Sequence, residues 1–270
     1  MTRAAGATNN QRRCASRFQP WMAQIYHELG APFSTLAKVS LKKVDATLMS
    51  EWRDQRLTEV SAATVNRELN LISSTLTTAK REWGWLTHNP ISEIKRPKNP
   101  KPRDRRISDH EIERVLLACQ YEVGQVPESR TQLVGCLFLL ALETAMRLGE
   151  LCAIRSDDIF LKERYVVLRD TKNNDRRHVP LSKKAVQLFT VIKALDFHVA
   201  QLVASSLFRK VCKRAEIEGL RFHDTRHEAL TQLARKIDVL DLARMVGHRD
   251  TRSLMIYYNA TATEIASRLD

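Results

Sequence analysis

Hydrophobic residues in the first third of the chain recur at intervals of three and four, which is the period of an amphipathic helix. The clearest apolar stripe consists of Val65, Leu69, Ile72, Leu76 and Ala79. Ser61 stands where an N-cap would begin this helix. The segments 19–29 and 45–56 are less regular, but no strand-like alternation competes with a helical interpretation. The pattern predicts a small all-helical domain over residues 19–94, after a polar, flexible tail at residues 1–18.

The pattern of the second part of the chain is mixed. Ser108 and Glu111 have the spacing of a capping box, and residues 131–146 are apolar on nearly all sides, as in a core helix. Two short β-like runs, at 165–168 and 177–181, flank a polar turn. Helical spacing then returns and continues to the end of the chain. The prediction is a mainly α fold with a small antiparallel β-sheet.

A basic, proline-rich segment separates the two patterns at residues 95–106. Three prolines interrupt regular structure there, and seven of the twelve residues are Lys or Arg. The seven cations are Lys95, Arg96, Lys98, Lys101, Arg103, Arg105 and Arg106. We predict an extended interdomain linker whose cations bind DNA; a merely solvated hinge is the alternative.

The net charge of the chain favours a polyanionic partner. Among 270 residues, 44 are Lys or Arg and 31 are Asp or Glu, which gives a net charge of +13. Counterion release from phosphates gives such a chain sequence-independent affinity for nucleic acid. The alternative is a highly soluble protein with many exposed lysines.

Other features of the sequence exclude several classes of protein. No apolar run reaches the ~18 residues that a membrane span needs, and the basic N-terminus lacks the apolar segment of a secretory signal. The five cysteines are an odd number and widely spaced, which argues against a disulfide framework or a zinc site. We therefore expect a cytoplasmic protein with reduced thiols.

Several polar residues stand where a charge needs a partner or a ligand. Arg147 follows the apolar helix, and its simplest partner is Glu150, three residues later. Lys172 lies in the turn between the β-like runs, where a solvated lysine is the ordinary interpretation. His223 and Arg226 have the i, i+3 spacing that places two side chains on one face of a helix.

A second histidine raises the alternative of a metal site. His227 follows His223 by four residues, which is the spacing of two metal ligands on a helix. A hydrolytic H-E-x-x-H site needs glutamate after the first histidine, whereas this chain has Asp224 there. An arginine between the ligands would also repel a dication, so metal binding is the weaker interpretation.

Taken together, four motifs in this order resemble those of the tyrosine recombinases, or phage integrases. The motifs are Arg147, Lys172 in a hairpin turn, His223-Asp-Thr-Arg226, and Gly247-His248 with Tyr257 nine residues later. The resemblance runs from about residue 20 to the end. It implies a helical core-binding domain joined by the basic linker to a mostly helical catalytic domain at 107–270. Ala145, where the family usually has glycine, and Thr225, where it usually has an apolar residue, are mild departures that touch no catalytic group.

These residue types suit the cleavage of a DNA phosphodiester without a metal ion or ATP. A phenol with a pKa of ~10 is a weak nucleophile and needs a base or a cationic pocket. Arg147 and Arg226 can fork onto the non-bridging phosphate oxygens and stabilise the added negative charge of the transition state. His223 is placed to accept the tyrosine proton.

The resemblance implies the remaining roles. Lys172 would protonate the departing 5′ oxygen, His248 would hydrogen-bond the phosphate, and Glu150 would orient or neutralise the first arginine. Tyr257 rather than Tyr258 would form a 3′-phosphotyrosyl link, because the nucleophile of the family follows the Gly-His histidine by nine positions. Attack by a 5′-hydroxyl of another duplex would then exchange strands, by chemistry shared with type IB topoisomerases.

The resemblance also implies partners. The enzyme would be encoded by a bacterium or phage, act at double-stranded DNA recombination sites and assemble there as a tetramer. Its C-terminal tail, 259–270, would dock on a neighbouring subunit; docking on its own domain is the alternative. We expect no cofactor, metal ion, membrane contact or additional N-terminal DNA-binding domain. Two rival functions are a non-catalytic DNA-binding protein on the same scaffold and a metal-dependent hydrolase using His223 and His227.

Overall fold

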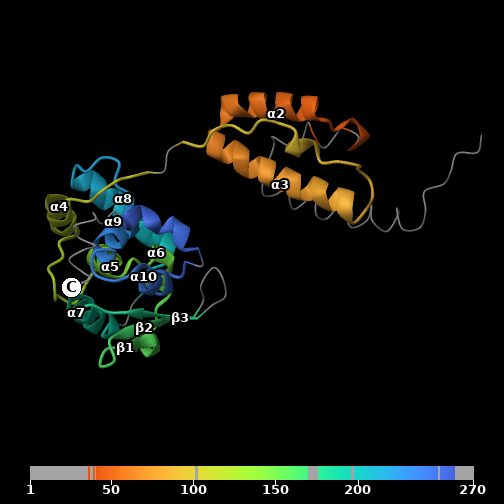
Figure 1. Cartoon of the computed structure of the whole chain (residues 1–270). Coiled ribbons are helices and arrows are strands. Elements are labelled where there is room, and N and C mark those ends of the chain that lie inside the picture. The colour runs from red at the N-terminus through yellow and green to blue at the C-terminus, as the bar shows by residue number, and fades with distance from the viewer. Residues whose placement is uncertain are drawn as a thin grey trace, which may run out of the picture. The chain divides into compact units, whose positions relative to one another are not determined.

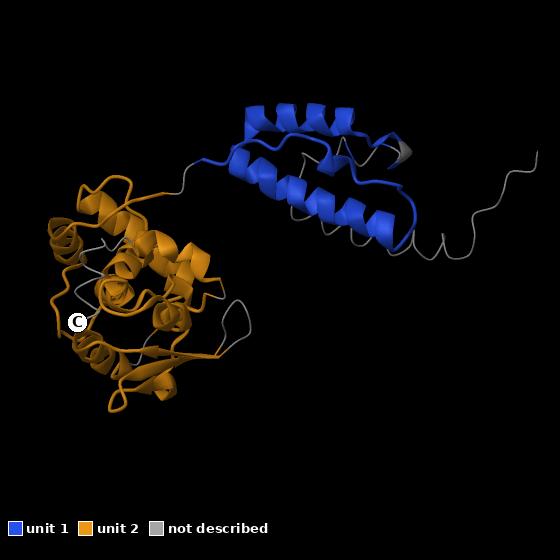
Figure 2. Cartoon of the chain, viewed as in Figure 1, with its two compact units in different colours: residues 1–102 blue, residues 103–270 orange. Residues whose placement is uncertain are grey.

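A computed structural model of the chain describes residues 36, 39, 41–100, 103–169, 176–195, 198–248 and 250–258. The chain divides into two compact units, residues 1–102 and 103–270, with the boundary inside the predicted linker (Figure 2). The predicted N-terminal tail, the segment 19–29, Lys101, Lys172 and the C-terminal tail lie outside the described residues.

The first unit is helical in its described part (Figure 1). Its elements are η3 (Leu41–Lys43), α2 (Ala46–Glu59), α3 (Ala62–Arg81) and η4 (Pro90–Ser92). Ser61 caps α3 as the sequence predicted, because its side chain accepts the backbone N–H of Thr64 at 3.3 Å. The apolar stripe of α3 supplies much of a small core, which consists of Met49, Trp52, Val65, Leu69, Leu76, Ile91 and Ile94.

The second unit is mostly helical and carries the only sheet in the described residues. Its helices are α4 (Asp109–Cys119), α5 (Arg130–Thr144), α6 (Leu148–Ala153), α7 (Lys183–Lys193), α8 (Gln201–Arg214), α9 (Asp224–Leu233) and α10 (Val239–Val246). Three short 3-10 helices are η5 (Ser156–Asp158), η6 (Thr251–Ser253) and η7 (Met255–Tyr257). The predicted capping box is confirmed, since Ser108 and Glu111 bond each other's backbone N–H groups at the start of α4.

The sheet has three antiparallel strands in the order β1-β2-β3. They are β1 (Ile159–Phe160), β2 (Tyr165–Leu168) and β3 (Arg177–Pro180). The last two are the predicted hairpin, paired with Val166 opposite Val179. The sequence did not predict β1, because a strand of two residues is too short to show an alternating pattern.

The apolar helix α5 organises the second unit. It is the predicted core helix, and α4, α6, α7, α8 and α9 all pack against it (Figure 1). Its end therefore meets the beginnings of α6 and α9, whose first turns carry the candidate catalytic residues. Within the described part of the chain, no helix is both long and apolar enough to cross a membrane.

Candidate active site

Arg226 lies in the first turn of α9 and is almost fully buried, with 4% of its surface exposed. Its guanidinium donates to the carbonyl of Ala145, at the end of α5, and at 3.0 Å to that of Val246, the last residue of α10. Helix C-termini carry partial negative charge, so two of them stabilise this cation without a carboxylate. Burial, and next the charge of Arg147, lowers the pKa of Arg226 to about 10, which still leaves it protonated at neutral pH.

Arg147 precedes α6 and forms the ion pair with Glu150 that the spacing predicted. Its guanidinium donates to Glu150 at 2.8 Å, and its backbone N–H donates to the same carboxylate at 2.9 Å. Although burial acts to raise the pKa of Glu150, the Arg147 N–H and the nearby guanidinium charges lower it. The carboxylate is thus charged and fixes an arginine whose side chain is 42% exposed.

Arg177, in β3, is a member of this cluster that the sequence did not single out. It donates to Glu150 at 2.8 Å, and both side chains are only 9% exposed. The sequence signal was weak, because a charged residue in a β-like run is usually solvated. The contact ties β3, which follows Lys172 in the sequence, to the carboxylate that holds Arg147.

The two predicted histidines, His223 and His248, lie close enough to the arginines to feel their charge. Burial, and next the charges of Arg226 and Arg147, lowers the pKa of both imidazoles. Each is therefore neutral at pH 7 and has a nitrogen lone pair. One nitrogen of His248, Nδ1, is 2.8 Å from the Ser253 hydroxyl.

A cavity of about 590 Å³ opens beside these residues. Arg147, His223 and Arg226 line it, together with Arg209 of α8 and Arg221, which the sequence analysis missed. None of its lining residues is Asp or Glu. We call His223 and Arg226 the cavity face of α9. A cavity with four arginines and no carboxylate is suited to bind phosphate oxygens.

Tyr257 stands in η7, half-buried, and its hydroxyl oxygen lies 3.0 Å from Nδ1 of His227. The structure thus places His227, rather than the predicted His223, against the phenol. The reason is that His227 lies one turn beyond His223, about 6 Å further along the helix axis, and η7 contacts α9 at that turn. Burial raises the pKa of Tyr257, whereas the charge of Arg226 acts to lower it.

The adjacent tyrosine has a different environment. The hydroxyl of Tyr258 donates to the carbonyl of Ile237 at 2.9 Å. In the described residues, no three His, Cys, Asp or Glu side chains gather as a metal ion would require. His227, the second histidine of the metal alternative, also bonds Asp104 at 2.9 Å.

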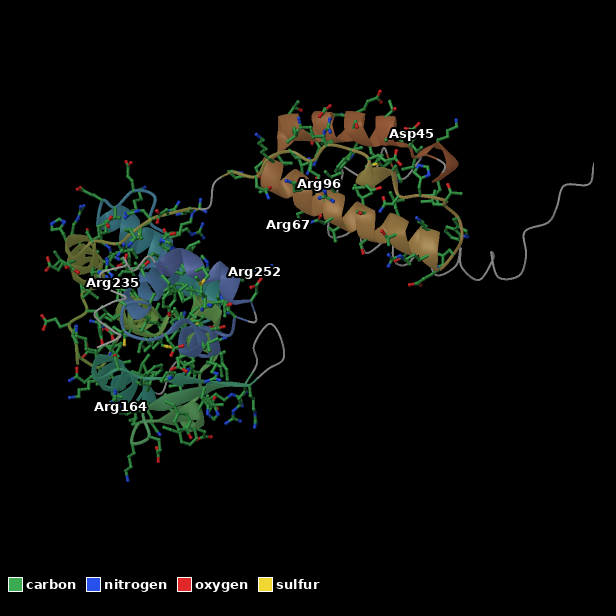
Figure 3. The ribbon with its side chains drawn as sticks, viewed as in Figure 1. Asp45, Arg67, Arg96, Arg164, Arg235 and Arg252 are labelled. Carbon is green, nitrogen blue, oxygen red and sulfur yellow. The ribbon has the colours of Figure 1, made fainter. Side chains whose placement is uncertain are left out.

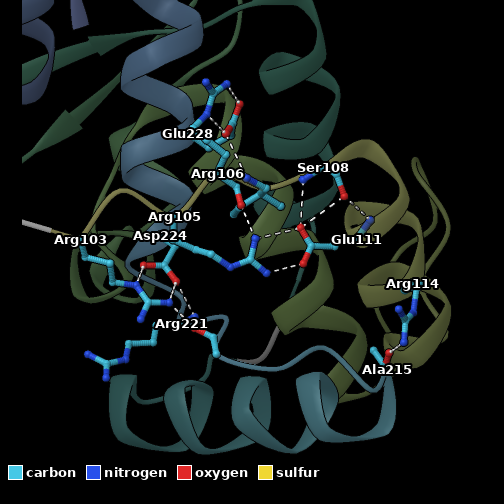
Figure 4. A network of polar contacts seen from close by, with 12 residues as sticks. Arg103, Arg105, Arg106, Ser108, Glu111, Arg114, Ala215, Arg221, Asp224 and Glu228 are labelled. Carbon is cyan, nitrogen blue, oxygen red and sulfur yellow. Dashed lines mark hydrogen bonds and ion pairs between the residues drawn. The ribbon is translucent and has the colours of Figure 1, made fainter. Parts of the chain in front are cut away.

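The arginines in the second half of the linker are held in ion pairs within their own unit (Figure 4). Arg103 forks onto Asp224 at 2.8 and 2.9 Å, and Arg106 onto Glu228 at 2.7 and 2.9 Å. Arg105 binds Glu111 of α4. Contact of these cations with DNA stays a prediction; in the structure Arg103 and Arg106 hold the linker along α9, because buried carboxylates need partners.

The first half of the linker has different contacts. Arg96 donates to Asn70 of α3 at 2.7 Å, and the side-chain amide of Asn66 donates to the carbonyl of Pro97 at 2.8 Å. Lys95 and Lys98 are exposed. Arg96 therefore lies along α3 (Figure 3).

Comparisons with known proteins agree with this geometry. Residues 105–264 match the model of the phage integrase family. A putative integrase/recombinase of Haemophilus influenzae is 40% identical over 83% of this chain and 63% of its own length. The shufflon-specific DNA recombinase of Escherichia coli is 32% identical over 87% of this chain and 63% of its own length. The chain thus spans less than two thirds of either relative.

Two solved structures share the fold. The Tn1549 transposon integrase superposes with a TM-score of 0.70 at 16% identity, over 93% of this chain and 97% of that one. A lambda integrase dimer gives 0.67 at 17% identity, over 94% and 73%. The second unit therefore has the architecture of an integrase catalytic domain. The chain belongs to the phage integrase family, the tyrosine recombinases.

Proposed function

We propose that this chain is a site-specific DNA recombinase that cleaves and rejoins DNA through a 3′-phosphotyrosyl intermediate at Tyr257, without ATP or a metal ion. The observation that supports this most is the cavity, where Arg147, His223 and Arg226 gather with no lining carboxylate. Family membership and the named activity of the shufflon-specific recombinase point to the same reaction.

The residues divide the reaction between them. Arg147 and Arg226 bind the non-bridging oxygens of the scissile phosphate and stabilise the charge of the pentavalent transition state. The Tyr257 oxygen bonds to phosphorus while the bond to the 5′ oxygen breaks. Neutral His223 and His248 hydrogen-bond the phosphate, and His223 was also predicted to act as the base.

Lys172 is the proposed acid that protonates the departing 5′ oxygen. It lies outside the described residues, in the connection between β2 and β3. The Arg177–Glu150 ion pair supports this role. It holds β3, the strand that follows the connection, beside Glu150, and Glu150 also binds Arg147.

The DNA contacts and the assembly are further parts of the proposal. The Tn1549 integrase was solved with circular intermediate DNA, and a lambda integrase tetramer with a Holliday junction. By analogy, this chain would bind duplex recombination sites and form a tetramer in which residues 259–270 dock on a neighbour. Exposed Lys95 and Lys98, with Arg96, are the best candidates for linker contacts to phosphate.

A nicked suicide substrate tests the proposal, because it traps the covalent adduct when the cleaved fragment diffuses away. We expect an adduct with the wild-type chain, none with Tyr257→Phe, and near wild-type adduct with the matched control Tyr258→Phe. A chelator should leave the yield unchanged. DNA binding without any adduct would instead identify a non-catalytic DNA-binding protein, and loss with chelator would favour a metal-dependent hydrolase.

A further inference from the structure

The phenol of Tyr257 is the first member of a hydrogen-bonded chain that leads away from the cavity. Its oxygen lies 3.0 Å from His227 Nδ1, and His227 Nε2 lies 2.9 Å from Asp104 Oδ1. The tyrosine and histidine rings are 5.2 Å apart between centroids. Neither His227 nor Asp104 belongs to the motifs that identified the family.

When His227 is neutral, the donors and acceptors in this chain determine where the protons lie. A carboxylate only accepts, so the single ring hydrogen of neutral His227 lies on Nε2, toward Asp104. Nδ1 then has a lone pair, and the only hydrogen between it and the tyrosine oxygen is the phenolic one. The arrangement is that of an activated nucleophile: a hydroxyl, an imidazole base and an acid that orients the base.

Building on the function proposed above, we propose that His227 accepts the proton of Tyr257 during cleavage and that Asp104 holds His227 in the required tautomer. The phenolic proton moves to Nδ1 as the tyrosine oxygen bonds to phosphorus. The bond to the 5′ oxygen breaks, and Lys172 supplies that oxygen with a proton. Rejoining reverses each transfer, and His227 returns its proton to the phenol.

This assignment gives the two histidines of α9 separate tasks. His223 lines the cavity with the two arginines, where it can hydrogen-bond a phosphate oxygen. His227 contacts the oxygen that becomes the nucleophile, and its side chain is only 20% exposed, so water has limited access to the proton.

Asp104 is 83% exposed, but its neighbours hold it in place. On either side of Asp104 in the sequence, Arg103 pairs with Asp224 and Arg106 pairs with Glu228. Asp224 and Glu228 in turn precede and follow His227 along α9. We call Asp224, His227 and Glu228 the linker face of α9, since their i, i+3, i+4 spacing places them on one side. The linker between the two units is thereby connected to the nucleophile through a single carboxylate.

Single-turnover cleavage of the suicide substrate by His227→Asn and His227→Gln tests the role directly. Both variants keep a polar amide but cannot take a proton, so cleavage should slow by about 100-fold while DNA binding stays at the wild-type level. Asp104→Asn should slow cleavage less, by about 10-fold. Wild-type or faster cleavage by both His227 variants would overturn the proposal and identify the contact as a restraint on the phenol.

Replacing Tyr257 with a fluorinated tyrosine that ionises near neutral pH separates proton transfer from positioning. An ionised nucleophile needs no base, so with this tyrosine His227→Asn should cleave within about fivefold of its His227 parent. If the 100-fold loss persists, His227 does not act as the base. If the wild-type chain forms no adduct at all, the recombinase proposal itself fails. If the wild-type chain and the His227 variants form the adduct at the same rate, only the assignment of His227 as the base fails.

Discussion

Arginines are present on both faces of α9, but the groups that pair with them differ between the two faces. On the linker face, the carboxylates of Asp224 and Glu228 neutralise two linker cations. On the cavity face, Arg226 has the carbonyls of Ala145 and Val246 as partners, which carry no net charge. Positive charge is therefore compensated where the linker is attached and left available where we propose that the phosphate binds.

This difference shows that a count of basic residues does not tell which of them are paired with carboxylates. The second half of the linker is as basic in sequence as the first, yet its three arginines are committed to carboxylates of their own unit. No motif in the sequence marks Arg209 or Arg221 as a candidate, although both line the cavity. Only the tertiary structure distinguishes the two groups.

The largest effect is expected on the cavity face. Arg226→Lys keeps the charge but loses the fork that binds two carbonyls, so the charge shifts away from the phosphate. Cleavage of the suicide substrate should fall by about 1,000-fold. The exposed Arg235, which follows α9 and does not line the cavity, provides the control (Figure 3). Arg235→Lys should cleave within about twofold of wild type, and equal loss in both would refute a specific role for Arg226.

On the linker face the effect should be on stability. Arg106→Ala leaves the Glu228 carboxylate, whose side chain is 6% exposed, without its main cation. Urea unfolding should show a loss of about 2 kcal/mol. The matched control in the other half of the linker is Lys98→Ala, an exposed site where a change within about 0.5 kcal/mol is expected. Comparable losses at both positions would show that the ion pair does not anchor the linker.

Acid should weaken the ion pairs that hold the second half of the linker. The pKa of Glu111 is lowered to about 2, chiefly by Arg105. That of Glu228 is also lowered to about 2: burial opposes the shift, and the hydrogen bonds from Arg106, Gln232 and the Ile107 N–H, with the charge of Arg106, together outweigh it. Carboxylates with a lowered folded-state pKa contribute stability that is complete above the unfolded value, near 4.5, and is lost as pH falls toward 2.

Unfolding free energies measured from pH 6 to pH 3 should therefore decline in wild type. The decline should be shallower in Arg105→Ala/Arg106→Ala, because the carboxylates of that variant titrate closer to their unfolded values. Parallel pH profiles for the two proteins would contradict this explanation.

The smallest effect concerns the salt dependence of DNA affinity. Each phosphate contact that is lost reduces the slope of log K against log salt by about 0.9. Lys95→Ala/Lys98→Ala should reduce the slope by nearly 2, whereas Arg103→Ala/Arg106→Ala should change it by less than about 0.5. A larger reduction for the arginine pair would mean that DNA displaces the carboxylates from these cations.

Local features were the ones that the sequence predicted well. The Ser61 and Ser108 caps, the apolar α5 and the β2–β3 hairpin follow from neighbouring residues and are present in the structure. The order of the motifs was enough to identify the family. Arg147 and Glu150 pair as expected because they are only three residues apart.

Contacts between distant segments could not be predicted in this way. Arg177 meets Glu150 across 27 positions, and Asp104 meets His227 across 123. Periodicity places His227 on α9 but does not say that η7 returns to that side of the helix. The partner of the nucleophile was therefore assigned to His223, the histidine of the motif, whereas the structure has His227 there.

The central claim is that the phenolic oxygen of Tyr257 attacks DNA. The most direct test is to digest the trapped protein–DNA adduct with protease and nuclease and to locate the remaining nucleotide by mass spectrometry. The account predicts a 3′-phosphonucleotide on Tyr257, in the peptide that contains both tyrosines. A nucleotide on Tyr258, whose hydroxyl is bonded to the Ile237 carbonyl, or on any residue other than Tyr257 would contradict it.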